Sequence, residues 1–166
     1  MRLFALDQGF PEPIVAVLRK WLTEAELVSI RDIDGKLMDI HDWQILLALH
    51  HHSREWDGLI TTDSGMVKQP RELATLMQTK LTLVVAESAG HDPLKATGLV
   101  FAHLPWIADR VDPASAQVWQ LRANRKPAEA PWELLRHVAD HQNRDLNDLY
   151  ESAKLSADEL IVDPLA

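Results

Sequence analysis

The sequence predicts an α/β fold in which helices cover both faces of a mostly parallel sheet of about five strands. Short apolar runs alternate with longer amphipathic segments along residues 1–122, and this order of elements is typical of a parallel sheet. Proline or aspartate stands at the start of several amphipathic segments, as it does in the first turn of many helices. Together these observations predict a three-layer α/β/α sandwich.

The apolar runs give the expected strands, and Leu81 to Ala86 is the clearest of them. Strands are expected at residues 3–6, 27–30, 58–62, 81–86 and 117–121. Helices are expected at residues 12–22, 40–52, 70–79, 93–110 and 132–140, with a polar helix at about 144–154. Asp39 is expected to cap the second helix, and the stretch from Arg31 to Lys36 is interpreted as polar, with a turn at Asp34-Gly35.

The composition excludes several classes of protein. The chain has 166 residues, 46% of them hydrophobic, which is enough for one domain with a real core. It has no cysteine, so disulfides, thiolate zinc sites and cysteine nucleophiles are excluded. No apolar stretch approaches the roughly 20 residues of a membrane span, and no secretory signal is seen. We therefore expect a cytoplasmic protein. Glycine-rich phosphate loops and nucleophile elbows are also absent from the sequence.

Charge is distributed unevenly along the chain. The formal net charge is −8, and residues 140–166 contribute −5 of it through seven acidic and two basic side chains. The body is close to balanced, so bulk electrostatic coating of nucleic acid is not expected, although a local basic patch is possible. A candidate boundary lies near Lys126-Pro127. It divides the chain into an α/β domain, residues 1–125, and a helical C-terminal extension, residues 126–166.

Acidic residues follow the ends of three predicted strands. Asp7, Asp63 and Glu87 each come just after the last apolar residue of a strand, where parallel sheets form their ligand crevice. Crowded carboxylates repel one another unless a cation lies between them, and oxygen ligands suit Mg²⁺ or Mn²⁺. At the start of the second helix, capping accounts for Asp39, whereas Asp42 fits a capping role or a site role equally well. Either of these two could supply a third acid to the site.

The motifs around these acids resemble those of a known family. Leu6-Asp7 after the first strand, Asp42-Trp43 opening a helix, and the run from Leu59 to Asp63 are similar to PIN-like domains, in particular to the VapC-like group of toxin–antitoxin ribonucleases. The segment from Met66 to Leu76, with its Lys68, Pro70 and Arg71, resembles the basic, helix-starting stretch that follows the aspartate in such relatives. The resemblance covers about residues 1–122.

The resemblance implies a PIN-like sandwich and metal-dependent cleavage of RNA phosphodiester bonds, with Mg²⁺ or Mn²⁺ as the cofactor. By position, Asp7 and Asp63 match the catalytic metal-binding aspartates, and Asp42 matches a third ligand or a residue that orients the water. Glu87 is a reserve ligand, and Lys68 and Arg71 are candidates for phosphate contact. The implied partners are RNA, a cognate antitoxin protein and a possible second copy of the chain.

Two departures from the family pattern support an alternative. Gln8 follows Asp7 where many relatives place a second acid, and Ser64-Gly65 follows Asp63 where an acidic or aromatic residue is common. These differences fit a PIN-like binding or regulatory module that lacks catalysis. A receiver-like fold was also considered, but it needs an acid pair after the first strand and a lysine after the last, where this chain has a lone Asp7 and Arg122. The cationic run of Arg122, Arg125 and Lys126 is interpreted as an ordinary solvated turn, with a patch for RNA phosphates, formed together with Lys68 and Arg71, as the alternative.

Overall fold

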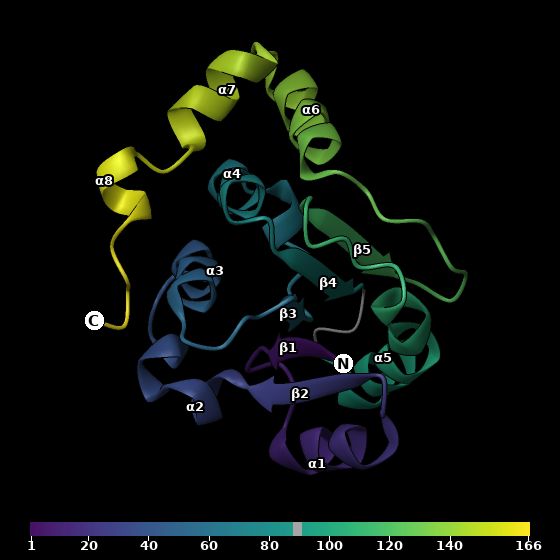
Figure 1. Ribbon diagram of the computed structural model, residues 1–166. Helices are drawn as coiled ribbons and strands as arrows, with labels where there is room; N and C mark the ends of the chain where they lie inside the picture. Colours follow the sequence, from purple (N-terminus) through teal and green to yellow (C-terminus); the bar gives the residue numbers. More distant parts are fainter. Residues whose placement is uncertain (88–90) are drawn as a thin grey trace.

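The structure is a computed structural model that describes residues 1–87 and 91–166 (Figure 1). Five strands form a single all-parallel sheet in the order β2-β1-β3-β4-β5. The predicted α/β class is therefore confirmed. The strands are β1 (Arg2–Leu6), β2 (Ala25–Ser29), β3 (Gly58–Thr61), β4 (Thr82–Ala86) and β5 (Gln117–Leu121).

Helices cover both faces of the sheet and complete a three-layer sandwich (Figure 1). Along β1, Leu3 and Ala5 join one buried cluster, whereas Phe4 and Leu6 join another, because successive side chains of a strand point to opposite faces. The helices α1 (Glu12–Trp21) and α5 (Pro93–Ala108) pack on the Phe4 side. The Leu3 side carries α2 (Ile30–Ile33), α3 (Asp42–His51), α4 (Pro70–Thr79), α6 (Pro131–Gln142) and α7 (Leu146–Ala153).

The expected helix start at residue 40, with Asp39 as its cap, is wrong. Residues 35–38 form a 3-10 helix, η1 (Gly35–Met38), in which Leu37 is buried, and Asp39 only ends it. The helix α3 begins at Asp42, and its N-cap is His41, whose backbone N–H donates to Oε1 of Gln44 at 3.0 Å. The stretch from Arg31 to Lys36, for which only a turn at Asp34-Gly35 was expected, also contains most of α2.

The C-terminal residues pack onto the sandwich and share its core. Leu135 and Leu149, from α6 and α7, are buried in the same cluster as the leucines of α4. The Gln78 side chain both donates to and accepts from the backbone of Leu155, at 3.0 Å in each case. A last short helix that the sequence did not predict, α8 (Ala157–Leu160), follows. Residues 126–166 thus contribute to the stability of the domain.

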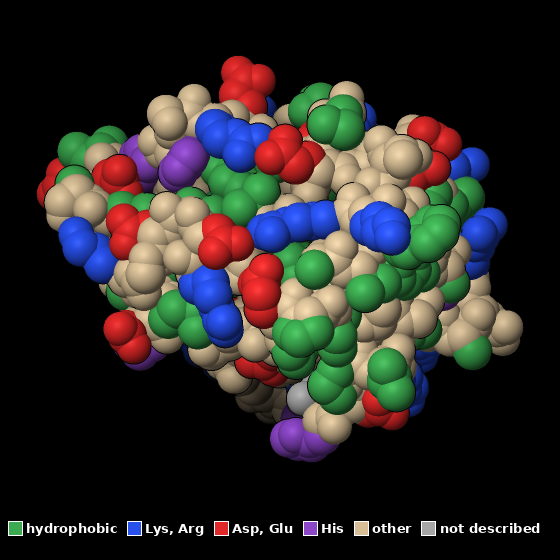
Figure 2. Space-filling model, turned by 90° about the horizontal axis from the view of Figure 1, so that it is seen from below, with side chains coloured by type: hydrophobic (Ala, Val, Ile, Leu, Met, Phe, Trp, Pro, Cys, Tyr) green, Lys and Arg blue, Asp and Glu red, His purple; other side chains and the backbone are tan. Residues whose placement is uncertain are grey.

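The surface does not concentrate one kind of charge on the face that carries α1. Seen from that side, hydrophobic, acidic and basic side chains are interspersed (Figure 2). Val17 and Trp21 of α1 are 46% and 67% exposed, and Lys20 lies over the Trp21 ring. Among the described residues, no helix has the length and apolarity needed to cross a membrane.

The order of the strands fixes where a ligand site belongs. From β1 the chain first adds β2 at one side of β1 and then returns to add β3 at the other side. Open parallel sheets bind ligands at this point of reversal, beyond the carboxyl ends of the strands. The point of reversal here lies between the ends of β1 and β3, which lead directly to Asp7 and Asp63.

Candidate active site

Asp7, the residue after β1, is held rigidly at the switch point. It is only 8% exposed, and its backbone N–H donates to the carbonyl of Ile60 at 2.9 Å. Its Oδ1 accepts from the backbone N–H of Gln8 at 2.7 Å, and its Oδ2 accepts from the hydroxyl of Thr61 at 2.7 Å. Both carboxylate oxygens are thus fixed in place, each by a hydrogen bond.

Asp63 reaches the same edge from β3. Its backbone N–H donates to Oγ1 of Thr61 at 3.0 Å, so that one buried hydroxyl connects Asp63 to Asp7. Its Oδ1 accepts from the backbone N–H of Gly65 at 2.7 Å. A Cβ on Gly65 would lie 2.8 Å from that oxygen, so glycine allows this close approach. The Ser64-Gly65 turn, which departs from the family pattern, orients the Asp63 carboxylate.

Asp42 supplies a third carboxylate from the first position of α3. Burial, followed in order of size by the negative charges of Asp7, Asp63 and Glu72, raises its pKa from 3.8 to about 6, while nearby His41 opposes the shift. The three aspartates predicted from the sequence therefore lie within electrostatic reach of one another. Of the two acids that were candidates for the third position, Asp42 interacts with Asp7 and Asp63.

Glu72 is a fourth acid at this site, and the sequence did not identify it. It lies half-buried in the first turn of α4. Burial is the main cause that raises its pKa, and the charge of Asp63 adds to it, whereas a backbone hydrogen bond, Arg71 and His41 act in the opposite direction. An acid in a first helical turn usually complements the helix dipole, which explains why the sequence gave no reason to single it out.

Glu87, Arg122 and Arg125 contact residues other than the three predicted aspartates. Glu87 follows β4, and its carboxylate forms an ion pair with Arg122 at the end of β5. Glu87 is not among the charges that act on Asp42. Arg125 lies over the Trp106 ring at 5.4 Å and donates to the carbonyl of Ala102. The structure thus pairs Glu87 with Arg122 and shows no interaction between Glu87 and Asp42.

The two predicted phosphate contacts differ in their surroundings. The guanidinium of Arg71 lies 4.3 Å from the centre of the Trp43 ring and forms a 2.6 Å ion pair with Glu159 of α8. Lys68 is exposed in the 3-10 helix η2 (Met66–Lys68), and its ammonium has no partner among the described residues. Because Arg71 is already paired with Glu159, Lys68 is better placed than Arg71 to contact a ligand.

The four carboxylates are near one another without forming a closed cage. Among residues 1–87 and 91–166, no three histidine or acidic side chains are grouped closely enough to hold a single ion as they stand. Mg²⁺ does not require such a cage, because it keeps several waters and binds through one or two carboxylates together with substrate phosphates. The donor set is oxygen-only, which suits this type of ion.

Comparison with protein-family models, with curated proteins and with solved structures finds no match for this chain. Interpretation of the site therefore depends on its own residues. The strand order also occurs in flavodoxin-like receivers, but the residues at the strand ends differ from that class. Gln8 stands beside Asp7 where a receiver needs a second acid, and Arg122, paired with Glu87, occupies the place of the lysine.

Proposed function

We propose that this protein is a metal-dependent endoribonuclease of the PIN-like type. The observation that carries the proposal is the convergence of Asp7, Asp42, Asp63 and Glu72, from four separate elements, on the switch point of a parallel sheet. Repulsion within such a group destabilises the folded protein. A bound divalent cation would offset that repulsion, and a phosphodiester substrate would approach the same crevice.

Each carboxylate is assigned a role according to its hydrogen bonds and its burial. Asp7, with both oxygens fixed by hydrogen bonds, and Asp63, held by its turn, would hold Mg²⁺ or Mn²⁺. When bound, the ion supplies charge neutralisation at the phosphate and an activated water. Asp42 would orient an attacking water and accept its proton as the water oxygen bonds to phosphorus, and the leaving oxygen would take a proton from solvent as its bond to phosphorus breaks. Lys68 contacts a phosphate of the strand.

The resemblance to the VapC-like group extends the proposal to the partners. We propose that the chain is the toxin of a toxin–antitoxin pair, acting in the cytoplasm, and that a cognate antitoxin protein covers the crevice. A second copy of the chain is a further candidate partner. Expression of the chain alone should then arrest growth, and Asp63→Asn should relieve the arrest.

Calorimetric titration with Mn²⁺, followed by an RNA cleavage assay, tests the catalytic proposal. The wild type should bind Mn²⁺ saturably, and Asp7→Asn and Asp63→Asn should each weaken binding by at least about tenfold, in the range found when a metal site loses a supporting group. Asp39→Asn is the matched control, because this exposed aspartate lies just before the same helix and does not act on Asp42. It should bind and cleave like the wild type.

A folded wild type that neither binds Mn²⁺ nor cleaves RNA would refute the proposal. That result would favour the alternative of a PIN-like binding or regulatory module. Cleavage that persists in Asp63→Asn would place the active site elsewhere in the molecule.

A further inference from the structure

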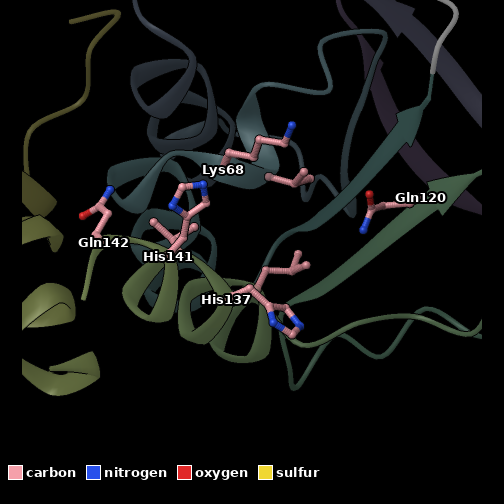
Figure 3. A pocket seen from close by; sticks show the side chains of 8 residues that line it. Lys68, Gln120, His137, His141 and Gln142 are labelled. Atoms are coloured by element: carbon pink, nitrogen blue, oxygen red, sulfur yellow. The ribbon is translucent and has the colours of Figure 1, made fainter. Parts of the chain in front are cut away.

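A second pocket lies beside the carboxylate edge and is lined by α6, η2 and β5. It has a volume of about 480 Å³, within the range of pockets that bind small molecules. Figure 3 shows Lys68 on one side, Gln120 on β5 at another, and the side chains of His137 and His141 on α6. The remaining lining residues are Val67, Leu134, Val138 and Gln142.

The chemistry of this pocket differs from that of the protein as a whole. The chain carries a net charge of −8, yet no acidic side chain is among the residues that line the pocket. Its apolar part consists of Val67, Leu134 and Val138, and the polar groups around it are an ammonium, two imidazoles and two amides. Such a pocket suits a ligand with a flat, largely apolar ring, hydrogen-bonding edges and a negative charge.

The pocket is connected to the carboxylate edge. An adjoining hollow of about 340 Å³ is lined by Ser64, Glu87 and Arg122, and it shares Val67, Lys68 and Gln120 with the pocket. Ser64 is the neighbour of Asp63 in the sequence. A chain molecule that passes Ser64, next to Asp63, can therefore continue past Lys68 into the pocket on α6 along a concave surface.

We propose that the pocket between η2, β5 and α6 is a subsite for an unpaired nucleotide of single-stranded RNA, next to the phosphodiester that is cut. This inference rests on the proposed nuclease function and adds to it the form of the substrate. The base lies on Val67 and Val138 and stacks on an imidazole of α6, as unstacked RNA bases do on aromatic and histidine side chains. Lys68 neutralises the phosphate between this nucleotide and the carboxylate site.

Both histidines can be changed without disturbing the fold. His137 and His141 are exposed and four residues apart on α6, where alanine is at least as favourable to the helix. Neither imidazole has a hydrogen-bond partner among the residues the structure describes. His50 is the matched control, because it is also exposed on a helix but lies by Trp56, Asp57 and Leu81, at the amino-terminal edge of the sheet.

The test is RNA binding measured without divalent metal, so that it does not depend on cleavage. A short fluorescein-labelled single-stranded RNA of mixed sequence is titrated with protein in EDTA, and anisotropy gives Kd. The double variant H137A/H141A should raise Kd about tenfold, within the range for loss of one stacked base. H50A should bind like the wild type, and D63N should bind at least as tightly because it removes a negative charge. A duplex of the same sequence should bind more weakly than the single strand.

Unchanged RNA affinity in the folded double variant would overturn the subsite, as would a wild type that binds the duplex and the single strand equally. A change of oligomeric state in the double variant, with RNA affinity unchanged, would identify the pocket as a protein interface instead. A parallel cleavage assay with Mn²⁺ separates the two proposals. If RNA binding depends on the histidines but no RNA is cleaved, the proposal of a nucleotide subsite stands and the proposal of a nuclease is refuted. If the double variant cleaves RNA with an unaltered KM, the proposal of a nuclease stands and the proposal of a nucleotide subsite is refuted.

Discussion

Replacing Asp42 by asparagine should stabilise the metal-free protein at neutral pH. Asp42 is half-buried, and its charged form is opposed by burial and by the charges of Asp7, Asp63 and Glu72. Asparagine has nearly the same shape but carries no charge, so the variant removes the repulsion and leaves the packing of α3 unchanged. A stabilising substitution at a site of this kind is expected where function has been maintained at the expense of stability.

The size and pH dependence of the effect follow from the pKa. In the folded protein the pKa of Asp42 is raised from 3.8 to about 6, so between these pH values the folded state binds a proton that the unfolded state has released. Stability of the wild type therefore falls as pH rises through this window and then levels off. The full shift corresponds to about 3 kcal/mol. Solvent screening of a half-exposed group, and the burial of asparagine itself, reduce the expected gain to about 1 kcal/mol.

Urea denaturation in EDTA, at pH 4 and at pH 7.5, measures this gain. The free energy of unfolding of Asp42→Asn should exceed that of the wild type by about 1 kcal/mol at pH 7.5 and should be close to it at pH 4. Asp39→Asn, which is exposed and not among the charges that act on Asp42, should show no comparable difference between the two pH values. A variant that is no more stable than the wild type at pH 7.5 would mean that the carboxylates do not repel one another, and the site would lose its physical basis.

Three further outcomes are expected. Thr61→Val should lower the free energy of unfolding by about 1–3 kcal/mol, because the buried Asp7 loses a hydrogen bond. Thr82→Val should be nearly neutral, because the buried Thr82 hydroxyl has no hydrogen-bond partner within residues 1–87 and 91–166. Urea denaturation compares the two variants. Gly58→Ala should lower the free energy of unfolding by about 3 kcal/mol or more, since the added Cβ would lie 1.8 Å from the carbonyl oxygen of Thr82. Gly35→Ala should leave the melting temperature almost unchanged, because its Cβ would meet nothing within 4 Å. Mn²⁺ at about 100 times its Kd should stabilise the wild type by about 2.7 kcal/mol, and an unchanged melting temperature would exclude binding to the folded state.

Local pattern was sufficient to predict the five strands and the longer helices, but not the short helices α2, η1, η2 and α8. The helix at residues 70–79 and the strand at residues 117–121 have the bounds expected from their apolar periodicity and from Pro70. The start of α3 was missed, because Asp39 and Asp42 are both good residues for a helix start. The choice between them depends on η1, whose Leu37 is buried against the core, and the sequence does not show that contact.

The sequence predicted those acidic residues whose place follows from the end of a strand. It missed an acidic residue that reaches the site through the packing of helices. Asp7 and Asp63 follow adjacent strands, so the parallel sheet brings them together. Glu87 also follows a strand, but a partner one strand away, Arg122, pairs with it. Glu72 joins the site because α4 packs beside α3, a tertiary relation that no local pattern records.

The acidic residues at the switch point differ in their partners from an acid at the amino-terminal edge of the sheet, and this contrast bears on function. At the amino-terminal edge, the carboxylate of Asp57 accepts from the guanidinium of Arg2 at 2.9 Å and from the backbone N–H of Leu3 at 2.7 Å. At the carboxyl edge, Asp42, Asp63 and Glu72 have no ion-pair partner among the described residues, and the adjacent arginine is paired with the C-terminal tail. Glu87, at the end of β4, is likewise neutralised, by Arg122. A group of acids without ion pairs at the switch point is the arrangement expected of a site that binds a cation from solution.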